Sequence, residues 1–142
     1  MRWGKQDLPA APATNSLIGR IEVPRIGLSA IVLEGAGTET LRLGLGHIPR
    51  TALPSEPGNV GVAGHRDTFF RSLRHIHRGD QIVITTARGR YQYRVTALGI
   101  VKPTDTWVLD NSASVHLTLV TCYPFYFLGA APDRFVVRAQ QF

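Results

Sequence analysis

The sequence predicts an all-β fold, a closed or nearly closed barrel of about eight strands with one or two short helices. Fourteen glycines and nine prolines divide the 142-residue chain at short intervals. The segments between them are rich in Val, Ile, Thr and Tyr, which favour strands. Because closure leaves no exposed sheet edge, a barrel is the arrangement expected for so many short strands.

The first sixteen residues are predicted to lie outside this barrel. Residues 1–16, MRWGKQDLPAAPATNS, are rich in proline and alanine and lack hydrophobic periodicity. They are interpreted as a linker, or as a stub left by removal of an upstream segment. Residues 17–142 are predicted to form one domain, since a chain with 44% hydrophobic residues can bury a single core of this size.

The first predicted strands lie in residues 19–35. Apolar and polar residues alternate there on both sides of breaks at Pro24 and Gly27, a pattern typical of two short strands joined by a turn. A brief helical turn is expected in residues 38–48. The next strand spans residues 59–63.

A short helix is predicted over residues 68–77, directly after this strand. Its arginines fall on one face and its apolar residues on the other, so we interpret the basic face as solvated. The two faces consist of Arg71, Arg74 and Arg78, and of Phe70, Leu73 and Ile76 or His77.

The clearest hairpin in the sequence lies in residues 79–101. Two strand-forming runs flank a turn at residues 87–89, and the tyrosines of the second run alternate with polar residues as far as Ala97. A connection with one helical turn is expected in residues 102–110. The last two strands are predicted in residues 114–122 and 133–142.

Composition narrows the function classes only broadly. A net charge of +6 attracts polyanions such as nucleic acid, anionic lipid or a phosphate-bearing cell wall. No stretch approaches the ~18 consecutive apolar residues of a membrane span and no signal peptide opens the chain, which is therefore expected to be soluble. The single cysteine cannot form an internal disulfide and leaves the redox compartment undecided.

That cysteine, Cys122, ends the predicted strand 114–122. Side chains alternate along a strand, so the apolar face that holds Leu117 and Leu119 is expected to pack on the core while Cys122 points outward. Reactive thiols are usually partly exposed in this way, whereas inert ones are more often buried. The pattern alone leaves two readings open, a nucleophile or a small packed side chain.

Five histidines are candidates for a base that serves this thiol. His116 is on the same strand but roughly 20 Å away at about 3.3 Å per residue, so it is excluded. His75 and His77 end the predicted helix and are expected at the surface. His47, in a turn, cannot be dismissed on the sequence. His65 follows a glycine at the end of an apolar strand, a common location for catalytic residues, and is the best candidate.

Two charged residues near these strands have more than one reading. Alternation in residues 133–142 places Arg134 and Arg138 outward. From this pattern alone, Arg134 is interpreted as a solvent-exposed arginine on a strand. Asp67, two residues after His65, is suited to orient that histidine or to cap the helix that begins near Thr68, and it is assigned no role.

Three motifs in the same order resemble those of sortases, the cysteine transpeptidases that attach proteins to the cell envelope of mainly Gram-positive bacteria. TLVTC (residues 118–122) is similar to the TLxTC signature of the family. GNVGVAGHRDTFF (residues 58–70) resembles its histidine strand and DRFVVRA (residues 133–139) its arginine strand. The resemblance covers nearly all of residues 17–139, including RIEVPRIGL near the start and GDQIVI after the helix.

The resemblance implies a sortase catalytic domain over residues 17–142, with the eight-stranded sortase barrel. It implies Cys122 as the nucleophile, His65 as the proton donor and acceptor, and Arg134 as the cation that positions the substrate and stabilises the oxyanion. The implied partners are an LPxTG-like sorting-signal peptide, cut after its Thr, and an amine acceptor of the cell envelope that resolves a thioacyl-enzyme.

The resemblance also implies a location on the extracellular face of the bacterial membrane. Family members normally carry a membrane anchor, which is expected to lie upstream or to have been removed. No cofactor and no metal are expected, since no cluster of carboxylates resembles a calcium site.

The chemistry explains why these three residue types occur together. An ordinary thiol is only about 3% ionised at pH 7 and an ordinary imidazole about a quarter protonated, so independent groups hold both reactive forms in under ~1% of molecules. The reaction needs the thiolate as nucleophile and the imidazolium as acid. A permanent guanidinium charge favours the thiolate and the oxyanion without competing for the proton.

Two details suggest a place within the family. Pilin-polymerising sortases usually carry an acidic-Pro-aromatic lid motif, and QDLPAAPATNS (residues 6–16) has none, so anchoring of single proteins is expected rather than pilus assembly. TCYPF (residues 121–125) together with APDRFVVRA (residues 131–139) looks most like class D or E.

Two other functions fit the sequence less well. An L,D-transpeptidase requires a glycine directly before its reactive cysteine, and VTCYPF has none. A non-catalytic basic β-barrel could bind a polyanion such as nucleic acid through Tyr91, Tyr93 and the arginine-rich helix. The tyrosines are better explained as core residues, so no nucleic-acid partner is expected.

Overall fold

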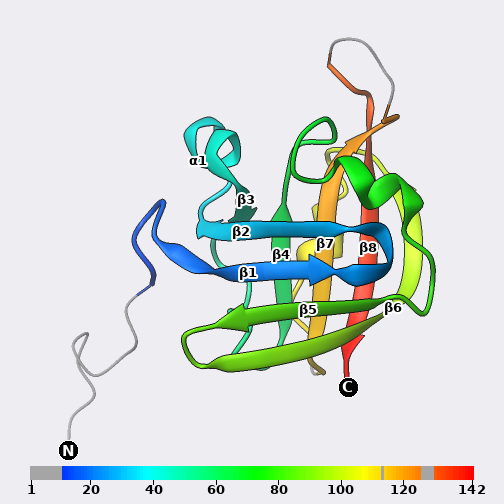
Figure 1. Cartoon of the computed structure of the whole chain (residues 1–142). Helices are drawn as coiled ribbons and strands as arrows, with labels where there is room; N and C mark the ends of the chain where they lie inside the picture. Colours follow the sequence, from blue (N-terminus) through cyan, green and yellow to red (C-terminus); the bar gives the residue numbers. More distant parts are fainter. Residues whose placement is uncertain (1–10, 113, 126–129) are drawn as a thin grey trace, which may run out of the picture.

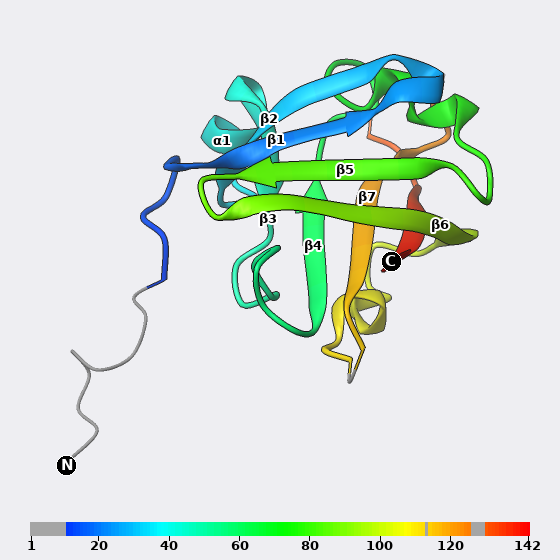
Figure 2. The same cartoon turned by 60° about the horizontal axis from the view of Figure 1, so that its bottom comes forward.

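The strands pair in the order β1-β2-β3-β4-β7-β8-β6-β5 and close into a barrel, which confirms the predicted fold class. The structure, a computed structural model, describes residues 11–112, 114–125 and 130–142. In Figures 1 and 2, β1, β2, β5 and β6 run across one side of the barrel, while β4, β7 and β8 cross them steeply on the other. The strands are β1 (Leu17–Val23), β2 (Leu28–Glu34), β3 (Leu45–His47), β4 (Asn59–Ala63), β5 (Gln81–Thr86), β6 (Gly89–Val101), β7 (His116–Tyr123) and β8 (Asp133–Gln141).

The helices described in these ranges are all short. They are the α-helix α1 (Thr38–Leu43) and the 3-10 helices η2 (Pro24–Ile26), η3 (Arg71–His75) and η4 (Thr106–Leu109). The helix predicted over residues 68–77 is therefore shorter and tighter than expected. Its apolar residues Phe70, Leu73 and Ile76 are buried, at 0%, 0% and 3% exposure. They are spaced three residues apart, which matches the three residues per turn of a 3-10 helix.

The predicted hairpins are present, with one correction in β6. β1 pairs antiparallel with β2 around η2, and β5 pairs antiparallel with β6. Tyr93 and Val95 on β6 face the core as expected. A register shift between Val95 and Ala97 in the pairing with β8 then exposes Ala97. The prediction of an unbroken alternation through Ala97 was wrong, because a bulge adds a residue to one strand and reverses the facing of those that follow.

Aliphatic side chains from all eight strands fill the barrel, together with Tyr93 and the apolar residues of the η3 segment. Tyr93 is fully buried, and burial raises its pKa to about 12. Tyr91 packs against the same core. The two tyrosines are therefore core residues and do not support nucleic-acid binding.

The segment ahead of β1 is described only from residue 11. The linker and lid-motif predictions for residues 1–16 therefore fall partly outside the described residues. The amide of Ser16 donates to the carbonyl of Ala13, and the amide of Asn15 donates to the carbonyl of Glu34 at 2.8 Å. The first bond closes a turn within the segment, and the second joins the end of the segment to β2.

Candidate functional site

Cys122 lies near the end of β7 and is partly exposed, as the alternation predicted. Leu117, Leu119 and Thr121, on the opposite face of the strand, are buried at 0%, 0% and 2% exposure. The inner face of β7 is therefore part of the core. β7 runs between β4 and β8 in the barrel (Figure 1). Both neighbouring strands can therefore present side chains beside the thiol.

The parallel pairing of β4 with β7 brings His65 to the same end of the barrel as Cys122. Ala63 pairs with Val120, and the amide of Gly64 donates to the carbonyl of Val120 at 3.2 Å. His65 comes two residues after Ala63, and Cys122 comes two residues after Val120. The pairing therefore brings both residues to the same end of the barrel.

Gly64 allows the chain to approach the core immediately before His65. A Cβ at this position would lie 2.3 Å from Cδ2 of Leu45 and 2.7 Å from Cδ2 of Phe70. Leu45 and Phe70 are both 0% exposed, so neither has room to move. A glycine is needed at position 64 to bring His65 to the rim.

A pocket of about 200 Å³ opens where these strand ends meet. Its lining residues are His65, Arg66, Asp67, Cys122, Ala130 and Ala131. The structure thus brings two of the three predicted site residues, His65 and Cys122, into one pocket. Sequence pattern could not identify the two alanines, because they become neighbours of the thiol only through the return of the chain into β8.

Arg134 lies beside Cys122 on the neighbouring strand. The two residues are direct partners in the antiparallel pairing of β7 with β8, so their side chains leave the sheet on the same face. Nη1 of Arg134 donates to the carbonyls of Asp133, at 2.9 Å, and of Ala131, at 3.3 Å. The guanidinium is therefore held at the edge of the pocket that Ala131 lines, by backbone oxygens rather than by the thiol or the imidazole.

The arrangement joins three chemical functions at one end of the barrel. A partly exposed thiol is available as a nucleophile, an exposed imidazole can exchange protons, and a permanent cation stands on the adjacent strand. The groups come from the ends of β4 and β7 and the start of β8. Such a set is suited to acyl transfer through a covalent intermediate.

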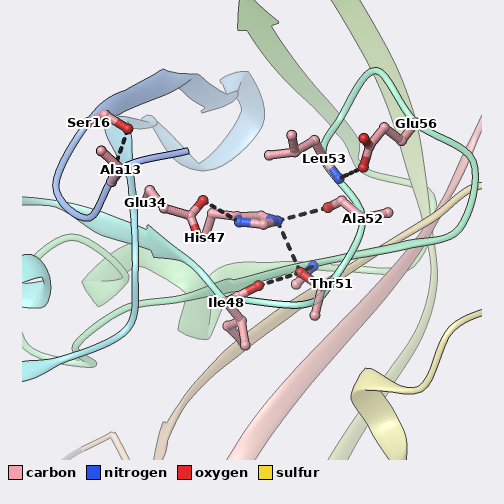
Figure 3. A network of polar contacts seen from close by, with 10 residues as sticks. Ala13, Ser16, Glu34, His47, Ile48, Thr51, Ala52, Leu53 and Glu56 are labelled. Carbon is pink, nitrogen blue, oxygen red and sulfur yellow. Dashed lines mark hydrogen bonds and ion pairs between the residues drawn. The ribbon is translucent and has the colours of Figure 1, made fainter. Parts of the chain in front are cut away.

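His47, the candidate that the sequence could not dismiss, is a structural residue. It is 2% exposed, and its Nδ1 lies 2.7 Å from Oε1 of Glu34 (Figure 3). Its Nε2 lies 2.8 Å from the carbonyl of Ala52, which can only accept, so Nε2 carries a proton. The hydroxyl of Thr51 donates to the carbonyl of Ile48 and lies 3.1 Å from the same nitrogen. Both ring nitrogens of His47 are thus occupied, Nδ1 by Glu34 on β2 and Nε2 by the loop after β3.

The remaining histidines lie as the sequence analysis expected. His116 begins β7, pairs with Asn59 and lies 3.2 Å from the hydroxyl of Ser112 through Nδ1. His75 and His77 are exposed at the end of η3. None of these three histidines is among the residues that line the pocket of Cys122.

Aromatic residues beside the thiol pack on one another. Ring centroids of Tyr123, Phe125 and Phe135 lie 5.4–6.2 Å apart in edge-on and stacked contacts. Phe125 and Phe135 also pack against the core. These rings fill the rim of the barrel.

A buried asparagine fixes the connection between β6 and β7 on the outside of the barrel. Nδ2 of Asn59, a residue that is 1% exposed, donates to the carbonyls of Val108 at 3.0 Å and Asp110 at 3.1 Å. Its Oδ1 accepts from the hydroxyl of Thr118 at 2.7 Å. Arg138 donates to the same Val108 carbonyl at 2.8 Å. η4 is therefore tied to β4, β7 and β8.

The described part of the chain holds neither a cluster of metal ligands nor a membrane-spanning helix. No group of three or more His, Cys, Asp or Glu side chains there is arranged to hold a metal ion. No helix in that part has the length and apolar character needed to cross a membrane.

Comparisons with known proteins agree with the fold and the motifs. A family model described as a sortase domain matches residues 21–142. Sortase D of Bacillus subtilis (strain 168) is 33% identical over 131 residues, which make up 92% of this chain and 66% of that protein. The chain spans about half to two-thirds of the length of such curated relatives.

Solved structures give the same result. A Clostridium perfringens Sortase D5 transpeptidase is 31% identical with a TM-score of 0.84, and the match covers 92% of this chain and 81% of that one. Sortase A from Corynebacterium diphtheriae is 31% identical with a TM-score of 0.83, over 92% of this chain and 62% of that one. Two of the three relatives are named sortase D, which fits the resemblance of TCYPF and APDRFVVRA to class D or E. Because the family match extends over all of the barrel from within β1 to the last residue, the chain belongs to the sortase family.

Proposed function

We propose that this chain is the catalytic domain of a cysteine transpeptidase that cleaves an LPxTG-like sorting signal and transfers its acyl part to an amine of the cell envelope. The observation that supports it most is the pocket shared by Cys122 and His65, with Arg134 as the strand partner of Cys122. Family membership supports a cell-envelope enzyme. The proposed place of action is the extracellular face of the membrane.

In the first half-reaction, the Cys122 thiol gives its proton to the imidazole of His65, and the thiolate attacks the carbonyl carbon of the Thr in the signal. A C–S bond forms and the carbonyl oxygen becomes an oxyanion. When the C–N bond breaks, the His65 imidazolium gives its proton to the departing amine. The products are a thioacyl-enzyme and the released C-terminal fragment.

In the second half-reaction, an amine of the acceptor attacks the thioester carbon. A C–N bond forms, the C–S bond breaks and the sulfur leaves as a thiolate. His65 takes the proton that the amine loses and returns it to the thiolate. The result is a new amide bond and free enzyme.

Arg134 contributes a charge that does not change during this cycle. A guanidinium stays protonated throughout, so it can stabilise both the thiolate and the oxyanion without exchanging protons. Its contacts with the carbonyls of Ala131 and Asp133 hold it next to the pocket. Loss of one oxyanion donor typically costs about 10²–10³ in rate.

The direct test is covalent capture. The chain is incubated with a library of LPxTx peptides, and the intact protein is weighed by mass spectrometry. We expect an acyl adduct on Cys122, no adduct on Cys122→Ala, and a much slower one on His65→Ala. His77→Ala is the matched control, because this exposed histidine lies outside the pocket. A folded wild-type chain whose thiol reacts with iodoacetamide but with none of the peptides would overturn the proposal.

A pair of arginine variants tests the third role. Arg134 and Arg138 lie on the same face of β8, and only Arg134 is paired with Cys122. Arg134→Ala should slow acylation about 10²–10³-fold with little change in thermal stability, whereas Arg138→Ala should keep most of the rate. Equal rates in the two variants would remove Arg134 from the mechanism.

A further inference from the structure

Asp67 is an exposed carboxylate in the pocket that holds Cys122 and His65. It is the acidic member of the set of described residues that line this pocket, beside His65 and Arg66. Neither half-reaction described above uses it. Its place beside the thiol therefore calls for a chemical explanation.

The structure argues against the helix-capping role that the sequence left open. η3 begins at Arg71, its capping residue is Phe70, and no side-chain hydrogen bond caps it. Within the described residues, Asp80 pairs with Arg25 and Asp133 pairs with Lys102. No hydrogen bond or ion pair to the Asp67 side chain is found in that same part of the chain. Asp67 thus brings to the pocket a negative charge that no described ion pair neutralises.

We propose that Asp67 selects the acceptor by attracting it as a cation, so that an amine that carries no carboxylate is favoured over one that does. This inference rests on the proposed transpeptidation. A sorting peptide presents a neutral carbonyl to Cys122, whereas an alkylamine is an ammonium ion at neutral pH and reaches the pocket carrying a positive charge. The cations Arg66 and Arg134 near the pocket and the net charge of +6 repel such an acceptor. A carboxylate at the pocket offsets that repulsion.

The size of the effect follows from the exposure of the side chain. A single charge pair about 5 Å apart in a water-like medium changes binding by roughly fourfold. Its influence shrinks with added salt, because the screening length falls to about 3 Å at 1 M. Asp67 is therefore expected to change selectivity between acceptors by a modest, salt-dependent factor.

The test compares two acceptors that share one reactive group. Hexylamine and 6-aminohexanoate both present a primary amine on an alkyl chain, and only the second carries a distant carboxylate. With the wild-type chain and a saturating LPxTx peptide, kcat/KM for aminolysis is measured for each amine. Asp67→Asn should lower kcat/KM for hexylamine about fourfold at low salt, and by much less at 1 M salt. It should also lower the hexylamine to 6-aminohexanoate ratio, because the second acceptor loses a repulsion between its carboxylate and Asp67 together with the attraction. Asp110→Asn, the same charge change at an exposed residue outside the pocket, should keep the wild-type ratio.

Each other outcome has a distinct meaning. A ratio unchanged in Asp67→Asn overturns the inference. If the ratio is unchanged while acylation and aminolysis slow together, Asp67 acts as a positioning residue for His65 instead. If the wild-type chain forms no acyl-enzyme, the proposed function fails, and the inference fails with it. A normal acyl-enzyme with an unaltered ratio leaves the proposed function intact and rejects the role of Asp67 alone.

Discussion

Substitution of Gly64 by alanine tests whether close packing before His65 sets the geometry of the site. The added Cβ would meet Leu45 at 2.3 Å and Phe70 at 2.7 Å, well inside normal contact distance. Both side chains are 0% exposed and belong to the core cluster. The clash therefore cannot be relieved by rotating a flexible surface group, and either the core or the segment that carries His65 has to shift.

The magnitude follows from the cost of adding carbon to a packed core. Such insertions typically destabilise a protein by about 1–3 kcal/mol. For a chain of 142 residues, 1 kcal/mol corresponds to about 3–5 °C in Tm, so the Tm of Gly64→Ala should fall by about 3–15 °C. A displacement of about 1 Å at His65 would slow acylation by up to ~10²-fold even where the chain remains folded.

Thermal unfolding followed by circular dichroism, combined with the rate of acyl adduct formation, measures both effects. Gly99→Ala is the matched control, because Gly99 lies on β6 and a Cβ there meets nothing within 4 Å. That substitution should leave Tm unchanged or raise it slightly, since alanine restricts the unfolded chain. A Gly64→Ala variant whose Tm and rate both match those of Gly99→Ala would refute the packing argument.

Two further substitutions test the supports of the barrel. Asn59→Ala removes two hydrogen bonds to the η4 segment and leaves the hydroxyl of Thr118, which is 0% exposed, without its acceptor. We expect urea denaturation to show that the free energy of unfolding falls by about 1–3 kcal/mol. An unchanged denaturation midpoint would contradict this. The hydrogen bonds from Arg25 hold the pKa of Asp80 below its usual range. The stabilisation is therefore complete above the unfolded pKa near 4 and lost as the pH falls toward the folded value. The decline in Tm from about pH 6 to about pH 3 should accordingly be shallower in Asp80→Asn than in the wild type, and parallel declines would show that the pair contributes nothing.

Local periodicity was enough to place the side chains along single strands. The alternation of β7 put Leu117 and Leu119 in the core and Cys122 outside, and the structure has them so. The prediction succeeded because side chains alternate at every residue of a strand, whatever the strand pairs with. It failed beyond Val95, where a bulge in the pairing with β8 reversed the facing of Ala97. Bulges depend on the partner strand, which the sequence does not state.

The choice among the histidines shows the same boundary. His47 and His65 both follow a short apolar run near a glycine. The sequence favoured His65 as the base but could not exclude His47. The structure buries His47 against Glu34, whose side chain lies on the neighbouring strand β2, and leaves His65 exposed at the pocket. The partner that commits His47 to a structural role is distant in the chain, so only the paired strands reveal it.

The sequence by itself determined that the chain forms a barrel of short strands, that its thiol faces outward, and which motifs it shares with a known family. Only the tertiary structure decided which strand ends meet, because the parallel pairing of β4 with β7 and the antiparallel pairing of β7 with β8 join segments far apart in the chain. Alternation is a local property of the backbone, whereas strand order and register depend on how distant side chains fill a common core. The pocket of Cys122, His65 and Asp67 therefore forms only when strand order and register are set.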